Sequence, residues 1–492
     1  MIKPNWILQR AALSPDKIAL INVHTDEQWT YRKLKSEILQ WIALFRKKNL
    51  NKGDRIAVLA RNSPELFPII FACGLEGFIY VPLNFRLSET EINELLMDSG
   101  AAILLYGKQL EKQIESVPFQ PKVNLHINNT EQMKPALHVN RSDPWFMIYT
   151  GGTTGKPKGV VLSHEAVNVN AMNTIVSWGI TEIDKTINYM PLFHTGGINA
   201  LSIPILMAGG TVIIGDAFDS EEALRATDTY KATISLFVPT MYQSMVHHPY
   251  FQTSTFPSMN VFLSGGAPCP PNIYHHFHEK KLHFKEGYGL TEAGPNNFFI
   301  RSEQAQVKIG SVGKSMLLNE VMIVKEDGTP CRSGEVGELY VKGNHLFSYY
   351  WNQRKETEVN FVGEWFKTGD LAKFDEDGDY YIVGRKKDMI ITGGENVYPQ
   401  EVEQCLLNHE HINEVAVIGI PDEKWGERVV AFITVYHQQH YDEEAVRNYC
   451  KKYLGNYKIP KDFFILDEIP KTDVGKIDKS KLAKRLLKEA GK

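Results

Sequence analysis

Cysteine is scarce in this chain of 492 residues. Its five cysteines are far apart and include no Cys-x-x-Cys pair: Cys73, Cys269, Cys331, Cys405 and Cys450. This distribution excludes a dense disulfide framework and the paired spacing of a zinc site. Isolated cysteines are typical of reduced thiols, so we expect a cytoplasmic protein.

An excess of one charge and a long apolar run are also absent. The formal net charge of -4 argues against nucleic acid as the main partner. The first residues contain no uninterrupted apolar core, so no secretory signal is expected. The most apolar stretch, "FPIIFACGLEGFIYVPL" (67–83), contains two prolines and Glu76. It predicts a buried helix and strand, and no stable membrane insertion.

The chain has ample apolar material, at 43% hydrophobic residues, and its length indicates more than one domain. Helical and strand patterns alternate, for example a helix over 30–48 and a strand over 55–60, as in an α/β protein. From about 300 to 383, short strands separated by glycines predict an antiparallel or barrel-like section. The polar segment 384–399 marks the clearest boundary. A small α/β domain of about a hundred residues follows it.

The stretch "TGGTTGKPKG" (150–159) combines glycines, hydroxyl groups and lysines, which suits phosphate binding. It is not a Walker A loop, which needs four residues between its glycines and a Ser or Thr after the lysine. Here Gly151 and Gly155 flank three residues, and Pro157 follows Lys156. Proline has no hydroxyl and disfavours a helical Lys156, so we predict a loop between two strands and a metal ligand from elsewhere. A surface hairpin without a ligand is the alternative.

Further polar motifs supply the parts that this loop lacks. In "GYGLTEAG" (287–294), Tyr288 offers a flat face for a purine, and Glu292 offers the single carboxylate typical of a magnesium site. The glycines of "LSGGAPCPP" (263–271) allow a ligand to approach the backbone closely. Asp370 could accept hydrogen bonds from a ribose diol. Taken alone, the stretch 287–294 is better explained by a tight turn with a capping Thr and Glu.

Five motifs occur in order: "YTGGTTGKPKG", "GYGLTE", "TGD", "GRKKDMIITGGENVYPQEVE" and "PKTDVGKIDK". Their order and approximate spacing resemble the AMP-forming acyl-CoA synthetase and ligase superfamily, which also holds peptide-synthetase adenylation domains and beetle luciferases. The resemblance covers nearly the whole chain. It implies an α/β fold whose large N-terminal domain (1–385) has two α/β sheets plus a distorted β-barrel. A small mobile α/β C-terminal domain (386–492) is implied as a lid.

The resemblance also implies roles for individual positions. Nucleotide binding is implied for Thr150, Gly151, Gly152, Thr153, Thr154, Lys158, Gly266, Ala267, Pro268, Tyr288, Gly289, Thr291, Asp370 and Arg385. Catalysis is implied for Lys476, His194, Thr291 and Glu292, with Glu292 as the metal ligand. The implied acyl pocket comprises Phe193, His194, Asn199, Gly265, Gly287 and Gly294. Lys387 falls at the hinge, and Gly393 and Gly394 fall on the CoA path. The superfamily usually has Ser at position 152 and often Asp at the hinge.

The implied reaction uses ATP, Mg²⁺ and CoA. A carboxylate attacks the α-phosphorus, pyrophosphate leaves, and the CoA thiol then attacks the acyl-adenylate. Two anions must approach in the first step, so catalysis depends on positioning and charge neutralisation, with Lys476 as one donor. The second step implies that the small domain rotates and removes Lys476.

The stretch "MPLFHTGGINAL" (190–201) bears on the substrate. It holds no carboxylate for an amino group, so an α-amino acid is not expected. It matches the acyl- and aryl-CoA ligase pattern, in which the histidine closes over the acyl pocket. Small and apolar walls predict a fatty or aromatic monocarboxylic acid.

A succinylbenzoate–CoA ligase, similar in length and in its opening "PNWILQRA", stays open. Two other functions also stay open: a stand-alone enzyme that loads a carrier protein, and a non-catalytic nucleotide sensor. The oligomeric state is open as well, and a homodimer is one possibility.

Overall fold

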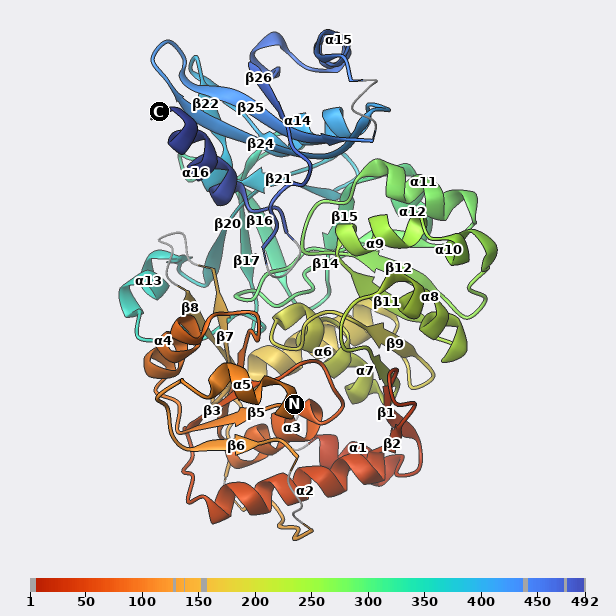
Figure 1. The fold of residues 1–492 in the computed structure, drawn as a ribbon, viewed down its shortest axis with the longest axis vertical. Helices are drawn as coiled ribbons and strands as arrows, with labels where there is room; N and C mark the ends of the chain where they lie inside the picture. The colour runs from red at the N-terminus through yellow and green to blue at the C-terminus, as the bar shows by residue number, and fades with distance from the viewer. Residues whose placement is uncertain are drawn as a thin grey trace.

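The computed structural model describes residues 6–126, 130–136, 138–151, 157–436, 441–472 and 476–490, with side chains up to residue 486. Four sheets hold the described strands, and the fourth, near the C-terminus, lies above the rest (Figure 1). The first has seven strands in the order β13 (Phe284–Glu286), β12 (Val261–Ser264), β11 (Ile234–Phe237), β9 (Lys185–Asn188), β10 (Thr211–Ile214), β1 (Ile18–Asn22) and β2 (Gln28–Thr30). All its pairings are parallel except β1 with β2. The carboxyl ends of β12 and β13 therefore meet at one edge, where ligands bind in open α/β sheets.

The second sheet carries the predicted phosphate loop. Its seven strands are β18 (Tyr349–Tyr350), β8 (Lys158–Ser163), β7 (Pro144–Thr150), β4 (Ile79–Leu83), β3 (Arg55–Leu59), β5 (Ile103–Tyr106) and β6 (Lys122–Asn124). Strands β7 and β8 pair antiparallel, with Thr150 opposite Lys158. The loop therefore joins two strands, as the proline predicted, and does not open a helix.

The third sheet occupies the region predicted to be barrel-like. Its strands are β14 (Phe298–Phe299), β15 (Ser311–Ser315), β21 (Tyr380–Arg385), β20 (Trp365–Phe374), β17 (Gly337–Lys342) and β16 (Glu320–Val324), with β19 (Phe361–Val362) on β20. Every recorded pairing in it is antiparallel. The α/β class and the antiparallel third section are confirmed.

The fourth sheet has its own core. It contains β23 (Glu395–Val397), β22 (Ile390–Thr392), β25 (Gly426–Val435) and β24 (Ile412–Asp422), with β26 (Asp462–Ile465) on β25. Val402, Val417 and Ile433 are among the buried side chains that pack only with neighbours from this part of the described chain. The predicted boundary at 385/386 falls between β21 and β22 and stays a prediction.

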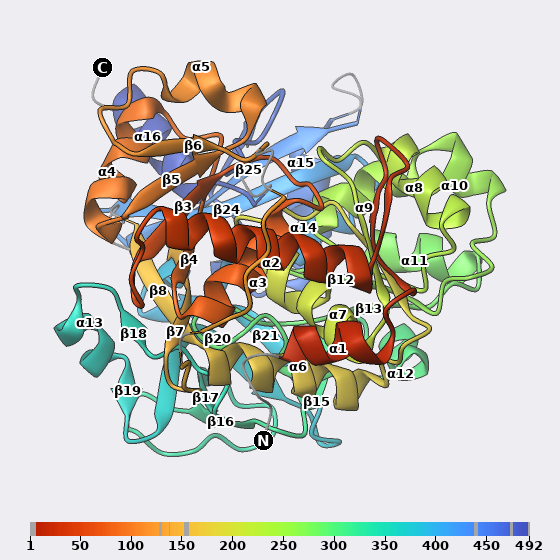
Figure 2. The ribbon, with the colours of Figure 1, turned by 90° about the horizontal axis from the view of Figure 1, so that it is seen from below.

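Helices cover the sheets. They are α1 (Trp6–Leu13), α2 (Tyr31–Lys47), α3 (Leu66–Glu76), α4 (Glu89–Ser99), α5 (Glu111–Ile114), α6 (His164–Trp178), α7 (Ser202–Ala208), α8 (Ser220–Thr229), α9 (Pro239–Val246), α10 (Pro249–Thr253), α11 (Pro271–Glu279), α12 (Ser302–Val307), α13 (Arg354–Val359), α14 (Pro399–Leu407), α15 (Glu443–Tyr453) and α16 (Lys479–Ala490). Helix α2 lies across α3 (Figure 2). Its start is fixed by Thr30, whose hydroxyl accepts a hydrogen bond from Lys33 N at 3.1 Å. No helix among the described residues is long and apolar enough to cross a membrane.

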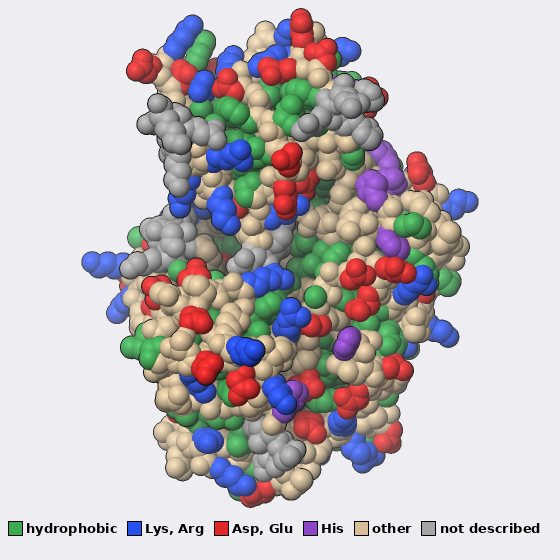
Figure 3. Space-filling view, viewed as in Figure 1, with side chains coloured by type: hydrophobic (Ala, Val, Ile, Leu, Met, Phe, Trp, Pro, Cys, Tyr) green, Lys and Arg blue, Asp and Glu red, His purple; other side chains and the backbone are tan. Residues whose placement is uncertain are grey.

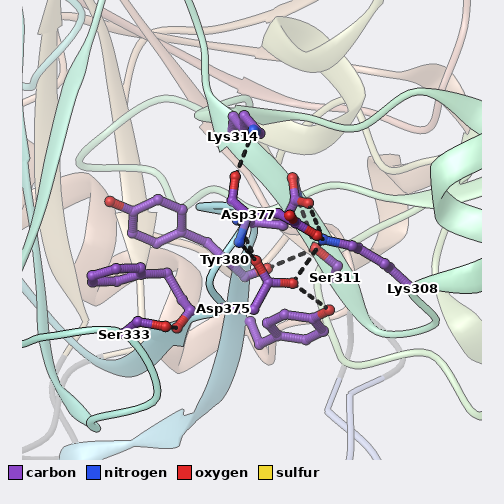
Figure 4. Close-up of polar contacts among 11 residues, drawn as sticks. Lys308, Ser311, Lys314, Ser333, Asp375, Asp377 and Tyr380 are labelled. Atoms are coloured by element: carbon purple, nitrogen blue, oxygen red, sulfur yellow. Dashed lines mark hydrogen bonds and ion pairs between the residues drawn. The ribbon is translucent and has the colours of Figure 1, made fainter.

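The turn between β20 and β21 is fixed by a lysine. Lys308 Nζ lies 2.8, 2.7 and 2.5 Å from carboxylate oxygens of Asp375, Asp377 and Asp379 (Figure 4). The hydrogen bonds that Lys308 donates to Asp375 and to the other two carboxylates raise the pKa of Lys308 above its ordinary value. Lys314 also donates to the backbone oxygen of Asp377 at 2.6 Å. The hairpin is therefore tied to β15 and to the residues just before it.

Candidate active site

The site is built at the edge where β12 and β13 end. Gly265 to Pro268 follow β12, and Gly287 to Glu292 follow β13, so these two predicted ligand-binding loops are neighbours. Gly266 has φ +83°, which L-residues with a side chain rarely adopt. A β-carbon on Gly287 would have no heavy atom within 4 Å, so this residue borders open space.

Three residues predicted to hold adenosine lie together. The Tyr288 hydroxyl donates to Asp370 Oδ2 at 2.6 Å, and Arg385 Nε lies 3.7 Å from Asp370 Oδ1. Asp370 and Arg385 are opposite each other in the β20–β21 pairing. Burial raises the pKa of Asp370, and the Arg385 charge opposes that rise. A tyrosine ring and a partly buried carboxylate held in fixed geometry suit a base and its ribose diol.

Lys476 reaches this loop from the C-terminal part of the chain. Its Cε lies 3.6 Å from the position of a β-carbon built on Gly266. The Lys476 amide donates to Thr472 Oγ1 at 3.2 Å, and the Thr472 amide donates back to Lys476 O at 2.6 Å. Burial lowers the pKa of Lys476, as does the Arg385 charge, while Asp370 opposes the change. Thr472 and Lys476 are therefore tied to each other, and Lys476 presents a partly buried amine to the predicted nucleotide site.

His194 is within electrostatic reach of that amine. Burial, and then the Lys476 charge, lower the pKa of His194 to about 4, so the ring is neutral at pH 7. Its Nδ1 accepts from Gly196 N at 3.4 Å, which leaves the proton on Nε2. The chain continues as a π-helical turn, Gly196–Ala200. Phe193 is buried, with its ring edge-on to Phe85 at 5.6 Å. Phe193 and His194 therefore lead directly into this turn, and their place in the acyl pocket stays a prediction.

The other predicted pocket and nucleotide residues differ in surroundings. A β-carbon on Gly289 would lie 2.2 Å from the backbone of Pro295, and one on Gly294 would lie 2.7 Å from Asn170 Oδ1. A side chain at either position would collide with its neighbours, so packing alone explains why both residues are glycine. Asn199 is buried and donates to Thr195 Oγ1 at 3.1 Å, and its Oδ1 has no partner among the described residues. Thr291 is also buried, while Ala267 and Pro268 lie in the loop after β12.

Glu292, the predicted metal ligand, is held by a residue that sequence reasoning missed. The Tyr350 hydroxyl donates to Glu292 Oε1 at 3.0 Å, and burial raises the pKa of Glu292. Among the described residues, Glu292 forms no ion pair. A carboxylate that is partly withdrawn from water and has no cation is costly, so a divalent ion fits this donor.

The phosphate loop is described only at its ends. Gly152, Thr153 and Thr154 lie outside the described residues. A β-carbon on Gly151 would have no heavy atom within 4 Å. Lys158 forms an ion pair with Glu356 of α13, and its Nζ lies 5.2 Å from the centre of the Tyr350 ring. No local sequence pattern marks Tyr350 or Glu356, because both contacts join distant segments.

The predicted hinge and CoA residues lie beyond β21. Lys387 is exposed in the 3₁₀ turn Lys386–Asp388. Gly393 and Gly394 have φ +60° and +84° in the tight turn between β22 and β23. Gly393 N donates to Trp425 O at 2.8 Å. The surface is indented where this C-terminal part meets the larger body (Figure 3).

Comparison with known proteins fits this geometry. The model of the AMP-binding enzyme family matches residues 7–351, and that of the AMP-binding enzyme C-terminal domain matches residues 401–476. A feruloyl-CoA synthase from Amycolatopsis sp is 33% identical, with 98% of both chains covered. The long-chain-fatty-acid–CoA ligase FadD13 of Mycobacterium tuberculosis is 33% identical, with 97% of both covered. The o-succinylbenzoate CoA synthetase MenE of Bacillus subtilis, solved with its acyl-adenylate intermediate, has a TM-score of 0.88 at 32% identity and 98% coverage of both chains.

The chain therefore belongs to the AMP-binding enzyme family. Within it, the protein is an AMP-forming acid–thiol ligase, an acid–CoA ligase with the two-part α/β fold of the adenylate-forming enzymes.

Proposed function

We propose that this ligase joins a fatty or aromatic monocarboxylic acid to CoA through an acyl-adenylate, at the site where Lys476, His194 and Asp370 converge. The position of Lys476 carries the proposal. Its Cε lies 3.6 Å from the Cβ position of Gly266, and its charge acts on both His194 and Asp370. A cation there can contact the substrate carboxylate and the α-phosphate of ATP together.

In the first half-reaction, a carboxylate oxygen bonds to the α-phosphorus and the bond from that phosphorus to the bridging oxygen of pyrophosphate breaks. Lys476 donates to the α-phosphate and to the attacking acid, which offsets the repulsion of two anions. His194 closes the apolar pocket as a neutral ring, because its pKa is lowered to about 4. Tyr288 stacks on adenine, while Asp370 and Arg385 hold the ribose.

Glu292 is proposed to hold Mg²⁺ together with the nucleotide phosphates, and the neighbouring Thr291 is proposed to contact phosphate. MenE of Bacillus subtilis has been solved with ATP and a magnesium ion. The bound ion supplies charge neutralisation at the phosphates. Tyr350 orients Glu292 through its hydroxyl, 3.0 Å from Oε1. The loop residues Thr150 to Thr154 and Lys158 are proposed to meet the β- and γ-phosphates.

The second half-reaction needs the CoA thiol where Lys476 now lies. We propose that the domain 386–492 rotates on domain 1–385 about Lys387, which is exposed between β21 and β22. The Gly393–Gly394 turn would then border the pantetheine path. The free cysteines support a reducing, cytoplasmic setting.

The acid is proposed from the pocket wall and from the relatives. Phe193 is buried against Phe85, and Gly287 borders open space without a side chain of its own. Feruloyl-CoA synthase and the FadD13 ligase, named for an aromatic and a fatty acid, are each 33% identical to this chain. Succinylbenzoate is the second candidate, because MenE has a TM-score of 0.88 with this fold.

The test is pyrophosphate release from ATP and Mg²⁺ across fatty acids of several lengths, benzoates, cinnamates and succinylbenzoate, with and without CoA. One class of monocarboxylic acid giving CoA-dependent turnover to AMP supports the proposal. Turnover with succinylbenzoate alone selects the second candidate. If each enzyme molecule releases pyrophosphate only once and added CoA does not start further turnover, the acceptor is a carrier protein and the CoA step is overturned.

A further inference from the structure

Lys158, the first residue of β8 after the phosphate loop, is already occupied by an anion from elsewhere in the chain. Its Nζ pairs with Glu356 Oε1 of α13 and lies 5.2 Å from the Tyr350 ring centre. The Lys158 side chain is 12% exposed and that of Glu356 is 38% exposed. This is therefore a hydrogen-bonded pair in which the ammonium is mostly buried and the carboxylate still meets water.

The surroundings of Glu356 keep it charged and in place. The hydrogen bond from Lys158 is the largest cause that lowers the pKa of Glu356. Asn360 Nδ2 donates to the backbone oxygen of Glu356 at 2.7 Å and lies 3.4 Å from its carboxylate. The amide of Tyr350, whose ring faces the ammonium, donates a hydrogen bond to Thr357 Oγ1 at 2.9 Å. Helix α13 and β18 thus form one support for Lys158.

We propose that Glu356 is a positioning residue that competes with the nucleotide phosphates for Lys158. The inference rests on the proposed phosphate contact of Lys158. The Lys158 ammonium can pair with a phosphate or with the Glu356 carboxylate. Each contact between Lys158 and a phosphate must therefore replace the ion pair with Glu356. Glu356 therefore weakens the binding of ATP and of pyrophosphate. When pyrophosphate forms, the carboxylate recaptures the ammonium and helps the product to leave.

The same support links this exchange to the proposed metal ligand. The Tyr350 ring faces the Lys158 ammonium, and the Tyr350 hydroxyl donates to Glu292 Oε1 at 3.0 Å. Movement of Lys158 toward phosphate removes a cation from the ring face. Phosphate capture and Glu292 orientation thus share one side chain.

The experiment compares Glu356→Gln with Glu358→Gln on the same helix. Glu358 is 61% exposed and pairs with Arg354 at 2.8 Å, so it controls for a lost charge on α13. We expect Glu356→Gln to lower the KM for ATP and the inhibition constant of pyrophosphate, each about three- to tenfold, with the KM for the acid unchanged. Glu358→Gln should leave all three constants as they are. A KM for ATP that is unchanged or raised in Glu356→Gln overturns the proposal.

Lys158→Met separates this inference from the proposed function. If Lys158 meets phosphate, Lys158→Met raises the KM for ATP, and adding Glu356→Gln to it changes nothing further. If Lys158→Met leaves ATP binding intact, the proposed phosphate contact itself fails. Glu356→Asp, which keeps the charge, should stay closer to the parent enzyme than Glu356→Gln. Thermal unfolding of each variant shows whether a change in KM accompanies a loss of fold.

Discussion

Lys476 Cε lies 3.6 Å from the Cβ position of Gly266, although 210 residues separate the two in the chain. The contact joins the C-terminal part of the molecule to the loop after β12. If the proposed role of Lys476 holds, this arrangement is the one for adenylate formation, because a partly buried ammonium then lies at the α-phosphate.

Lys476→Ala should therefore separate the two half-reactions. We expect adenylate formation, followed as pyrophosphate release, to fall about a hundredfold or more, since a charged donor in a dry site is lost. Thioester formation from a supplied acyl-adenylate should change little. Lys481→Ala, at an exposed position of α16, is the control. Equal losses in both half-reactions would contradict the assigned role.

Asp370→Asn should weaken ATP binding. The variant keeps an oxygen for the Tyr288 hydroxyl, now 2.6 Å from Oδ2, and loses the charge that faces Arg385 and a ribose diol. We expect the KM for ATP to rise about tenfold, in line with a charged hydrogen bond. The parent enzyme should prefer ATP over 3′-deoxy-ATP, and the variant should lose most of that preference. An unchanged preference would place the ribose elsewhere.

Tyr350→Phe should raise the Mg²⁺ concentration that the enzyme needs. The change removes the hydroxyl 3.0 Å from Glu292 Oε1 and leaves the carboxylate free to rotate. We expect half-saturation by Mg²⁺ at a concentration several-fold higher, with saturated turnover less affected. Tyr349→Phe, the adjacent and exposed tyrosine, should behave like the parent enzyme. If both variants titrate alike, Tyr350 does not orient the metal ligand.

Lys308→Met should destabilise the β20–β21 hairpin. Asp375, Asp377 and Asp379 offer ligand atoms within 4.8 Å of one another and would repel without the ammonium. We expect a lower unfolding midpoint and a raised KM for ATP, because the hairpin carries Asp370 and Arg385. Calcium ions should restore part of the lost stability. Lys325→Met, which breaks a pair with Glu335 alone, should have the smaller effect.

His345 should make the enzyme sensitive to acid. Burial lowers its pKa from 6.5 to about 4, and its Nε2 donates to Asn297 Oδ1 at 2.9 Å. Between pH 6.5 and about 4, the His345 ring is protonated in the unfolded chain but neutral in the folded protein. Stability is therefore full above pH 6.5 and falls as the pH drops toward 4. At pH 5 this proton uptake lowers the free energy of unfolding by about 2 kcal/mol. Denaturant unfolding of His345→Gln should depend less on pH over this range; an unaltered slope would contradict it.

The sequence predicted those features that depend on neighbours in the chain. Pro157 excluded a Walker A helix, and β7 and β8 do form a hairpin there. The helix over 30–48 and the strand over 55–60 are α2 and β3. These follow from apolar spacing and backbone limits that each segment carries by itself.

The missed features all depend on contacts between distant segments. Glu356 and Lys158 are 198 positions apart, and Tyr350 and Glu292 are 58 apart. A charged residue on a short helix has no local mark that shows its partner. The roles of the site residues stay predictions, although the structure brings Tyr288, Asp370, Arg385 and Lys476 to one place.

The ammonium of Lys308 makes the β20–β21 turn independent of dissolved ions. Three carboxylates as close as Asp375, Asp377 and Asp379 would otherwise suit calcium. ATP and pyrophosphate both chelate divalent cations, and their concentrations change with every burst of turnover. A hairpin that depended on a dissolved cation would lose stability during turnover. A counter-ion built into the polypeptide cannot be stripped away by the substrate or by the product.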